Sequence, residues 1–225
     1  MTKALIVVTS HAALGNTGTA TGFWLTELTH PYYALVDSGI PTDIVSIAGG
    51  EAPVDPKSWE EEDPGNARFL ATPELVEQLK NSHPLSAITP SDYQAIIFAG
   101  GHGTMWDFPD DEHVQRAAVS IFEQNGVVAA ICHGPAALVN MCYHNGDHLI
   151  TNKKVTGFTN EEEDAVGLTG IVPFLLEDKL KAANAHFVAA EAWAKNVVVD
   201  GKLVTGQNPQ SAAGVGEAVA ELLLE

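Results

Sequence analysis

The sequence predicts an α/β fold, a single domain over residues 1–225 in which helices sandwich a doubly wound, mostly parallel sheet. Two observations support this prediction. Short apolar runs rich in Val and Ile alternate almost throughout with longer segments of helical pattern, which is typical of parallel sheets with right-handed crossovers. In addition, residues 127–131 are apolar at every position, as expected of a strand that is covered on both faces.

The first predicted elements are a strand at residues 4–9, a helix at 22–38 and a strand at 43–47. Pro31 lies inside the predicted helix, where it removes an N–H that an internal turn needs. We therefore expect a kink or a break near His30. Residues 48–66 contain three prolines and an acidic run, and we expect a long loop of the kind that often serves as a lid.

The later elements continue the alternation. A helix at 110–125 begins with three acidic residues, a position that the helix dipole favours. The other expected elements are a helix at 73–81, strands at 95–98 and 126–131, a short helix at 136–141, a strand at 155–156, a helix at 173–183, a hairpin of 197–199 with 203–205, and a helix at 211–224.

Polar or glycine-rich segments follow four of these strands, at Ser10, 100–103, Cys132-His133 and 157–163. Because active sites of parallel sheets gather at the carboxyl ends of the strands, we expect these segments to meet in one site.

Cys132 is the strongest candidate nucleophile. It ends an apolar strand and precedes Gly134 and Pro135, which suit a tight turn that opens a helix. The arrangement is similar to the nucleophile elbow of α/β-hydrolases, with Cys in place of Ser. A buried structural cysteine is the alternative, and a common one in an apolar run. The adjacent His133 and the glycine turn favour the catalytic interpretation, because a packing cysteine needs neither.

Composition narrows the possible partners. The formal net charge is −18, from 29 acidic and 11 basic residues, which argues against nucleic acids and anionic membranes as partners. No apolar run is long enough to span a bilayer, and residues 1–8 lack a secretory pattern. The two cysteines, Cys132 and Cys142, do not form a disulfide framework, so we expect a cytoplasmic protein in which Cys142 is structural.

The nine histidines show no metal-ligand spacing, and we expect neither a metal nor a cofactor. A structural metal between His11 and His30 is a lesser alternative.

Six segments of the chain form a recognisable series of motifs: Thr26-Glu27-Leu28 with His30-Pro31, and residues 54–58, 99–104, 130–135, 156–159 and 204–209. In this order they resemble the ThiJ/PfpI superfamily of class I glutamine amidotransferase-like proteins, and most closely its chaperone and glyoxalase III branch. The resemblance implies a flavodoxin-like fold and a homodimer.

The resemblance also implies roles for individual residues. Cys132 is expected to be the nucleophile, Glu27 to hydrogen-bond its sulfur, and His133 to act as the base. A solvated helix face is the ordinary alternative for Glu27. The acid of the triad is expected among Glu161, Glu162, Glu163 and Asp164, and we select Glu163 by its spacing after Gly157-Phe158. Gly100 and Gly101 are expected to form an oxyanion hole through their N–H groups, and His102 to line the substrate pocket.

The activity that the resemblance implies is that of a glutathione-independent glyoxalase, which converts small 2-oxoaldehydes such as methylglyoxal into 2-hydroxy acids such as D-lactate and serves in carbonyl-stress defence. Alternatives are a holdase chaperone, a redox-sensing stress protein, and a cysteine peptidase or amidohydrolase, with deglycase activity a further option. Because a helix N-terminus and His133 both favour a thiolate, we expect a lowered pKa for Cys132, with Glu27 protonated at neutral pH.

Overall fold

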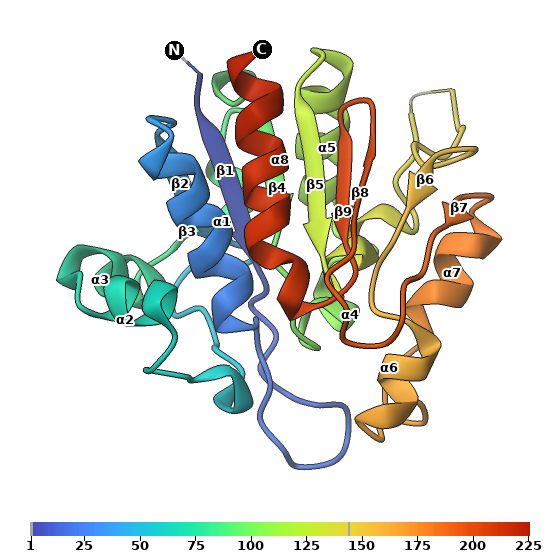
Figure 1. Ribbon diagram of the computed structural model, residues 1–225, viewed down its shortest axis with the longest axis horizontal. Coiled ribbons are helices and arrows are strands. Elements are labelled where there is room, and N and C mark those ends of the chain that lie inside the picture. Colours follow the sequence, from blue (N-terminus) through green and yellow to red (C-terminus); the bar gives the residue numbers. More distant parts are fainter. Residues whose placement is uncertain (1, 144) are drawn as a thin grey trace.

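The computed structural model describes residues 2–143 and 145–225, and its centre is a seven-stranded sheet (Figure 1). The strand order is β3-β2-β1-β4-β5-β9-β8, and every pair is parallel except β8 with β9. The strands are β1 (Ala4–Val8), β2 (Thr42–Ser46), β3 (His83–Pro84), β4 (Ala95–Phe98), β5 (Val127–Ile131), β8 (Val197–Asp200) and β9 (Leu203–Gly206). The predicted fold class and the predicted hairpin are confirmed.

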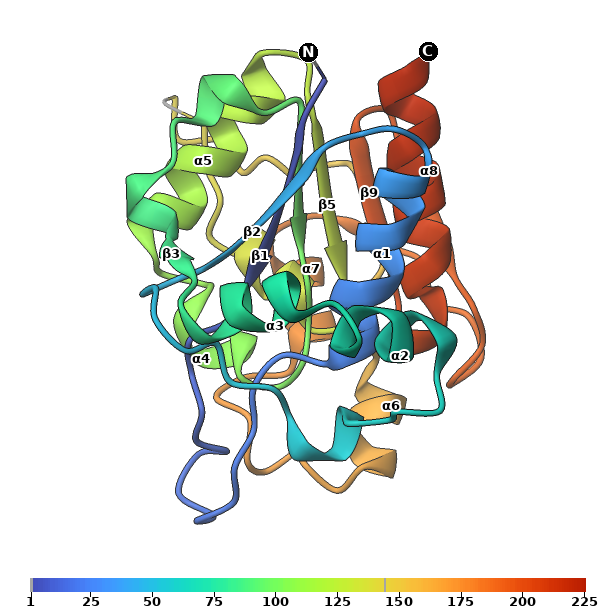
Figure 2. The same ribbon diagram turned by 90° about the vertical axis from the view of Figure 1, so that its left-hand side faces the viewer.

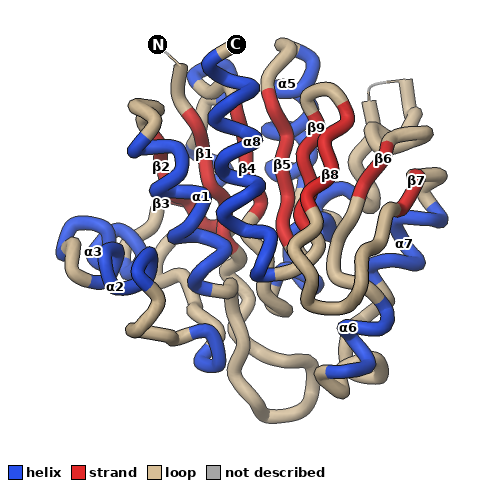
Figure 3. The backbone as a smooth tube through the Cα atoms, viewed as in Figure 1, coloured by secondary structure: helices blue, strands red, loops and turns tan. Residues whose placement is uncertain are grey.

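Helices cover both faces of the sheet. Figure 2 shows α1 and α8 together on one side of the strands and α5 on the other. A second, separate parallel sheet consists of β6 (Lys154–Val155) and β7 (His186–Phe187). It lies next to β8, the edge strand of the main sheet (Figure 3). The helices are α1 (Leu25–Asp37), α2 (Pro64–Leu70), α3 (Pro73–Lys80), α4 (Thr104–Asp107), α5 (Glu112–Glu123), α6 (Asn160–Ala165), α7 (Leu176–Ala182) and α8 (Ala212–Leu224). No helix in the described residues is long and apolar enough to cross a membrane.

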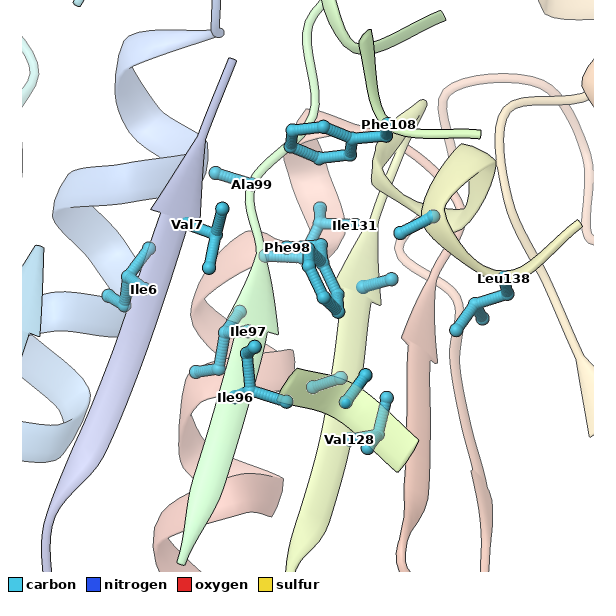
Figure 4. Close-up of a cluster of buried hydrophobic side chains, with 14 of the residues drawn as sticks. Ile6, Val7, Ile96, Ile97, Phe98, Ala99, Phe108, Val128, Ile131 and Leu138 are labelled. Atoms are coloured by element: carbon cyan, nitrogen blue, oxygen red, sulfur yellow. The ribbon is translucent and has the colours of Figure 1, made fainter. Parts of the chain in front are cut away.

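The central strands are buried over their whole length. All residues of β1, β4 and β5 are inaccessible to solvent, because the helical layers cover both of their faces. Figure 4 shows Phe98, Phe108 and Ile131 within this core, and the rings of Phe98 and Phe108 meet edge to face at 5.6 Å. Each such side chain contributes roughly 1.5–3 kcal/mol by leaving water. The carboxyl ends of β4 and β5 are thereby anchored on a rigid platform.

Of the kink or break expected near His30, the structure excludes the break. Helix α1 starts at Leu25 and continues through Pro31 to Asp37. Gly216 of α8 packs directly on Pro31, since an added Cβ there would lie 2.6 Å from the Pro31 Cα. Tertiary packing on α8 therefore outweighs the hydrogen bond that Pro31 cannot donate.

Residues 48–66 are also more ordered than predicted. A short 3₁₀ turn spans Pro56–Ser58, and α2 begins at Pro64. The Asp63 carboxylate accepts a hydrogen bond from the Asn66 N–H at 2.9 Å and caps this helix. Asp63 followed by Pro64 is a signal for the start of a helix, but a segment with several prolines is also typical of a loop.

The predicted helix at 136–141 is absent. A 3₁₀ segment at Gly134–Leu138 takes its place after Cys132. Its five residues form too short an element to provide the dipole of a full α-helix.

Candidate active site

Cys132 occupies a sharp turn at the carboxyl end of β5. Its φ of +59° lies in the left-handed region, which costs a non-glycine residue roughly 1–3 kcal/mol. Two backbone hydrogen bonds hold the turn: the Cys132 N–H donates to Gly206 and the Cys132 carbonyl accepts from Phe158, both at 2.8 Å. Gly134 is required next to it, because a Cβ there would lie 2.2 Å from the Phe98 carbonyl oxygen. The turn directs the cysteine side chain out of the sheet.

A hydrogen-bonded row of side chains lies behind the sulfur. The Nδ1 of His133 is 3.3 Å from the Cys132 Sγ, and its Nε2 is 2.7 Å from the Glu163 Oε2. The Nε2 of His102 is 2.8 Å from the other Glu163 oxygen. One carboxylate thus serves two imidazoles, whose ring centroids are 4.0 Å apart. The structure brings together all four residues, including the acid selected by spacing.

The charges in this row follow from burial and pairing. Burial opposes ionisation of Glu163, but the two histidines hold its pKa well below the ordinary value. Burial, together with the neighbouring His102, lowers the pKa of His133. We infer a neutral His133 at neutral pH that donates its Nε2–H to Glu163. The Nδ1 of that tautomer is an acceptor and can take a proton from the thiol.

The other three acidic candidates have different surroundings. Glu161 and Asp164 are exposed, whereas Glu162 is fully buried. The Glu162 side chain forms a capping box with Thr159 at the start of α6. Its Oε1 also accepts hydrogen bonds from the Trp193 N–H at 2.8 Å and the Asn208 side chain at 2.9 Å. Glu162 therefore connects α6 to the loop before β8. The Thr-x-x-Glu spacing is the sequence signal that indicates this capping role of Glu162.

Glu27 is buried in the first turn of α1. Its Oε2 accepts the Gly100 N–H at 2.8 Å, whereas Oε1 makes no hydrogen bond of good geometry in the described part of the chain. Burial raises the pKa of Glu27 to about 8, although the neighbouring Cys132 and the hydrogen bond from the Gly100 N–H partly oppose the shift. The carboxyl is therefore protonated at neutral pH, as expected from the sequence.

The predicted lowering of the Cys132 pKa is wrong. Burial first, and the Glu27 carboxylate second, raise the pKa of the thiol well above its ordinary value. The sequence shows the neighbouring His133, but it does not show that the sulfur is withdrawn from water or that the expected α-helix is a 3₁₀ turn.

The predicted oxyanion hole needs one correction. The Gly100 N–H already donates to Glu27, so it is not free to bind a substrate oxygen. Gly101 lines the cavity with a φ of +102°, and a Cβ on it would lie 2.4 Å from the Gly22 carbonyl oxygen. Neither the Gly101 N–H nor the His133 N–H donates to an acceptor among the described residues. These two amides therefore have an N–H that is not already paired within the described residues.

Cys132 faces a cavity of about 310 Å³ at the carboxyl edge of the sheet. Most of the residues that line this cavity were not predicted from the sequence. The lining residues not predicted are Trp24, Thr26, His30, Glu60, Asp63, Phe158, Val166, Trp193, Pro209 and Gln210. His30 and Phe158 stood inside recognised motifs, but nothing in the sequence pattern pointed to Trp193.

Potential metal ligands in the described residues gather only within this site, at His102, His133 and Glu163. Their ligand atoms lie within 4.8 Å of one another and are hydrogen-bonded among themselves. His30 instead pairs with Asp63 at 2.9 Å, and His11 stacks on Trp106, so neither histidine supports the alternative of a metal between them.

The site combines a cysteine on a left-handed turn at the end of a strand, a His–Glu pair behind it and a buried carboxyl beside it. Together with the fold, these features define a class of α/β proteins whose site is built around a cysteine. The chain belongs to the DJ-1/PfpI family, whose model matches residues 18–222.

Two curated relatives carry informative names. Glyoxalase 3 of Candida albicans is 32% identical over 97% of both chains. A glutathione-independent glyoxalase of Saccharomyces cerevisiae is 32% identical over 93% of both chains.

Solved structures agree with these matches. Glyoxalase III from Candida albicans superposes with a TM-score of 0.91 at 31% identity, over 98% of this chain and 97% of that one. The 24-kDa rapid encystment protein of Francisella tularensis superposes with a TM-score of 0.98 at 49% identity, over the full length of both chains.

Proposed function

We propose that this protein is a glutathione-independent glyoxalase that converts 2-oxoaldehydes of the methylglyoxal type into 2-hydroxy acids through a hemithioacetal on Cys132. The observation that carries the proposal is the 3.3 Å contact between Cys132 Sγ and His133 Nδ1 at a cavity of about 310 Å³. The names of the full-length relatives support it. The sulfur-bearing residue is only 3% exposed, which favours a small molecule over a polypeptide substrate.

The first step is addition to the aldehyde. The thiol proton moves to Nδ1 of His133, the sulfur forms a bond to the aldehyde carbon, and the carbonyl electron pair moves to oxygen. The N–H groups of Gly101 and His133 stabilise the oxyanion, a kind of contact worth roughly 3–4 kcal/mol in other enzymes. Protonation of this oxygen gives the hemithioacetal. The raised pKa of Cys132 means that proton transfer accompanies attack and does not precede it.

The second step is an isomerisation. His133 removes the proton from the former aldehyde carbon while the neighbouring carbonyl oxygen takes up a proton from the protonated Glu27, and an enediol forms. His133 then gives its proton to that neighbouring carbon, the hydroxyl on the sulfur-bearing carbon returns its proton to Glu27, and a thioester of the 2-hydroxy acid results. Water attacks this thioester, the sulfur leaves and takes up a proton, and the acid is released. One carbon is oxidised while its neighbour is reduced, so the sequence needs no external oxidant, and Cys132 supplies the thiol that glutathione provides elsewhere.

The test is an assay of lactate formed from methylglyoxal by the purified protein without glutathione. We expect wild type and Cys142→Ser to form lactate, and Cys132→Ser to form none. Loss of methylglyoxal without lactate would contradict the proposal, because simple adduct formation also consumes the aldehyde. The homodimer that the resemblance implies remains a proposal, and light scattering coupled to gel filtration tests it.

A further inference from the structure

The cavity is larger than methylglyoxal requires. Methylglyoxal has five non-hydrogen atoms, whereas a volume of about 310 Å³ lies at the lower end of the range for pockets that enclose drug-sized ligands. Three aromatic side chains line the cavity, Trp24, Phe158 and Trp193, and Val166 and Pro209 add apolar surface. The space beside the reacting carbon is therefore walled by groups that bind rings and alkyl chains.

Trp193 is held at the cavity in a strained conformation. Its φ is +66°, and its N–H donates to the buried Glu162 carboxylate at 2.8 Å. The ring meets Phe158 edge to face at 5.6 Å, yet the residue remains 40% exposed. Backbone strain of this kind persists only where the surrounding structure enforces it. The indole is thus a preformed apolar surface with a face still available to a ligand.

Carboxylates line the described part of the cavity without a Lys or Arg beside them. The described lining residues include the acids Glu60 and Asp63 but neither Lys nor Arg. Burial opposes the ionisation of Asp63, but hydrogen bonds from Asn66 and His30 hold the pKa of its carboxyl below the ordinary value. The other ionisable lining groups are Cys132 and three histidines. His30 is paired with Asp63, and His102 and His133 are both paired with Glu163.

The whole chain adds to this effect, because its formal net charge is −18. A negatively charged ligand is repelled on approach and finds no free cation among the described residues that line the cavity.

We propose that the site selects uncharged 2-oxoaldehydes with an aromatic substituent, that is arylglyoxals, and rejects their carboxylated analogues. The inference rests on the proposed function and specifies its substrate class. The aldehyde carbon reaches Cys132 while the ring lies against Trp193 and Trp24, and the chemistry is otherwise that given above. A carboxylate added to the ring of such a substrate lies near the acidic Glu60 and Asp63, and no Lys or Arg side chain among the described lining residues balances its negative charge.

The experiment compares initial rates on methylglyoxal, phenylglyoxal and 4-carboxyphenylglyoxal, with lactate, mandelate and carboxymandelate as the measured products. We expect kcat/KM to be about tenfold higher for phenylglyoxal than for methylglyoxal, the scale of a favourable aromatic contact. We expect at least a roughly tenfold lower value for the carboxylated compound than for phenylglyoxal, because like charges repel. Added salt should narrow the second ratio.

Two pairs of variants assign these effects to residues. Trp193→Ala should lower kcat/KM for phenylglyoxal by roughly three- to tenfold and for methylglyoxal by less than about twofold. The matched control is Trp59→Ala, which removes a tryptophan that is 47% exposed and does not line this cavity. Glu60→Gln should raise the relative rate on the carboxylated compound, whereas Glu61→Gln should not.

The two proposals fail in distinguishable ways. Turnover of methylglyoxal with equal rates on phenylglyoxal and its carboxylated analogue, or without a preference for phenylglyoxal, overturns the selectivity alone. Absence of product from all three compounds refutes the glyoxalase. In that case, calorimetric titration of Cys132→Ala with the two aromatic compounds still tests the selectivity, and equal affinities would contradict it.

Discussion

Replacement of Glu27 by glutamine should remove a large pH dependence of stability. The carboxyl is fully buried, and its pKa is raised from 4.5 to about 8 in the folded protein. In the unfolded chain the same group ionises near 4.5. Between these values the unfolded state releases a proton that the folded state retains. The stability of the wild type therefore falls as pH rises from about 4.5 and levels off above about 8.

The magnitude follows from the shift. Each pKa unit corresponds to about 1.4 kcal/mol, so a shift from 4.5 to about 8 is worth roughly 5 kcal/mol in total. Between pH 5 and pH 8 the wild type should lose roughly 3–4 kcal/mol through this group. The glutamine of the Glu27→Gln variant cannot ionise, and its amide oxygen can still accept the Gly100 N–H.

The assay is urea denaturation of wild type and Glu27→Gln at several pH values, with the difference in unfolding free energy plotted against pH. The other ionisable groups are shared, so the difference reports Glu27 together with the change that its removal causes in the neighbouring Cys132. We expect the variant to gain roughly 3–4 kcal/mol relative to wild type from pH 5 to pH 8. Parallel curves would refute the reasoning and mean that Glu27 is ionised in the folded protein. An infrared band of a protonated carboxylic acid, present only in wild type, provides an independent check.

Three further predictions concern the turn and the triad. Cys132→Ser should lose at least about 99% of turnover with an unchanged circular dichroism spectrum, and substantial remaining activity would exclude this nucleophile. Glu163→Gln should lower kcat roughly 100-fold or more and shift the acid limb of the rate profile to lower pH, because the carboxylate raises the pKa of His133; an unmoved limb would contradict the pairing. Gly134→Ala should cost at least about 2 kcal/mol in urea denaturation, whereas Gly170→Ala, with no neighbour within 4 Å, should be nearly neutral.

Local patterns were sufficient for most of the fold. The apolar runs that became β1, β4 and β5 are buried at every residue, because strands covered on both faces show no alternation. The predictions failed where a local rule competed with tertiary packing. Pro31 is tolerated within α1 because Gly216 of α8 packs on it, and no property of residues 22–38 reveals that contact.

The sequence by itself determined which residues are the candidates for the chemistry: Cys132 at a strand end, His133 beside it, and an acid shortly after Gly157-Phe158. These identities depend on order and spacing along the chain, and those are properties of the sequence. Tertiary structure decided which acid reaches His133, that the Gly100 N–H is taken by Glu27, and that Trp193 lines the cavity. It also decided the protonation of Glu27 and Cys132. Burial sets those pKa values, and burial is created by segments far apart in the chain, so no local stretch of sequence contains it.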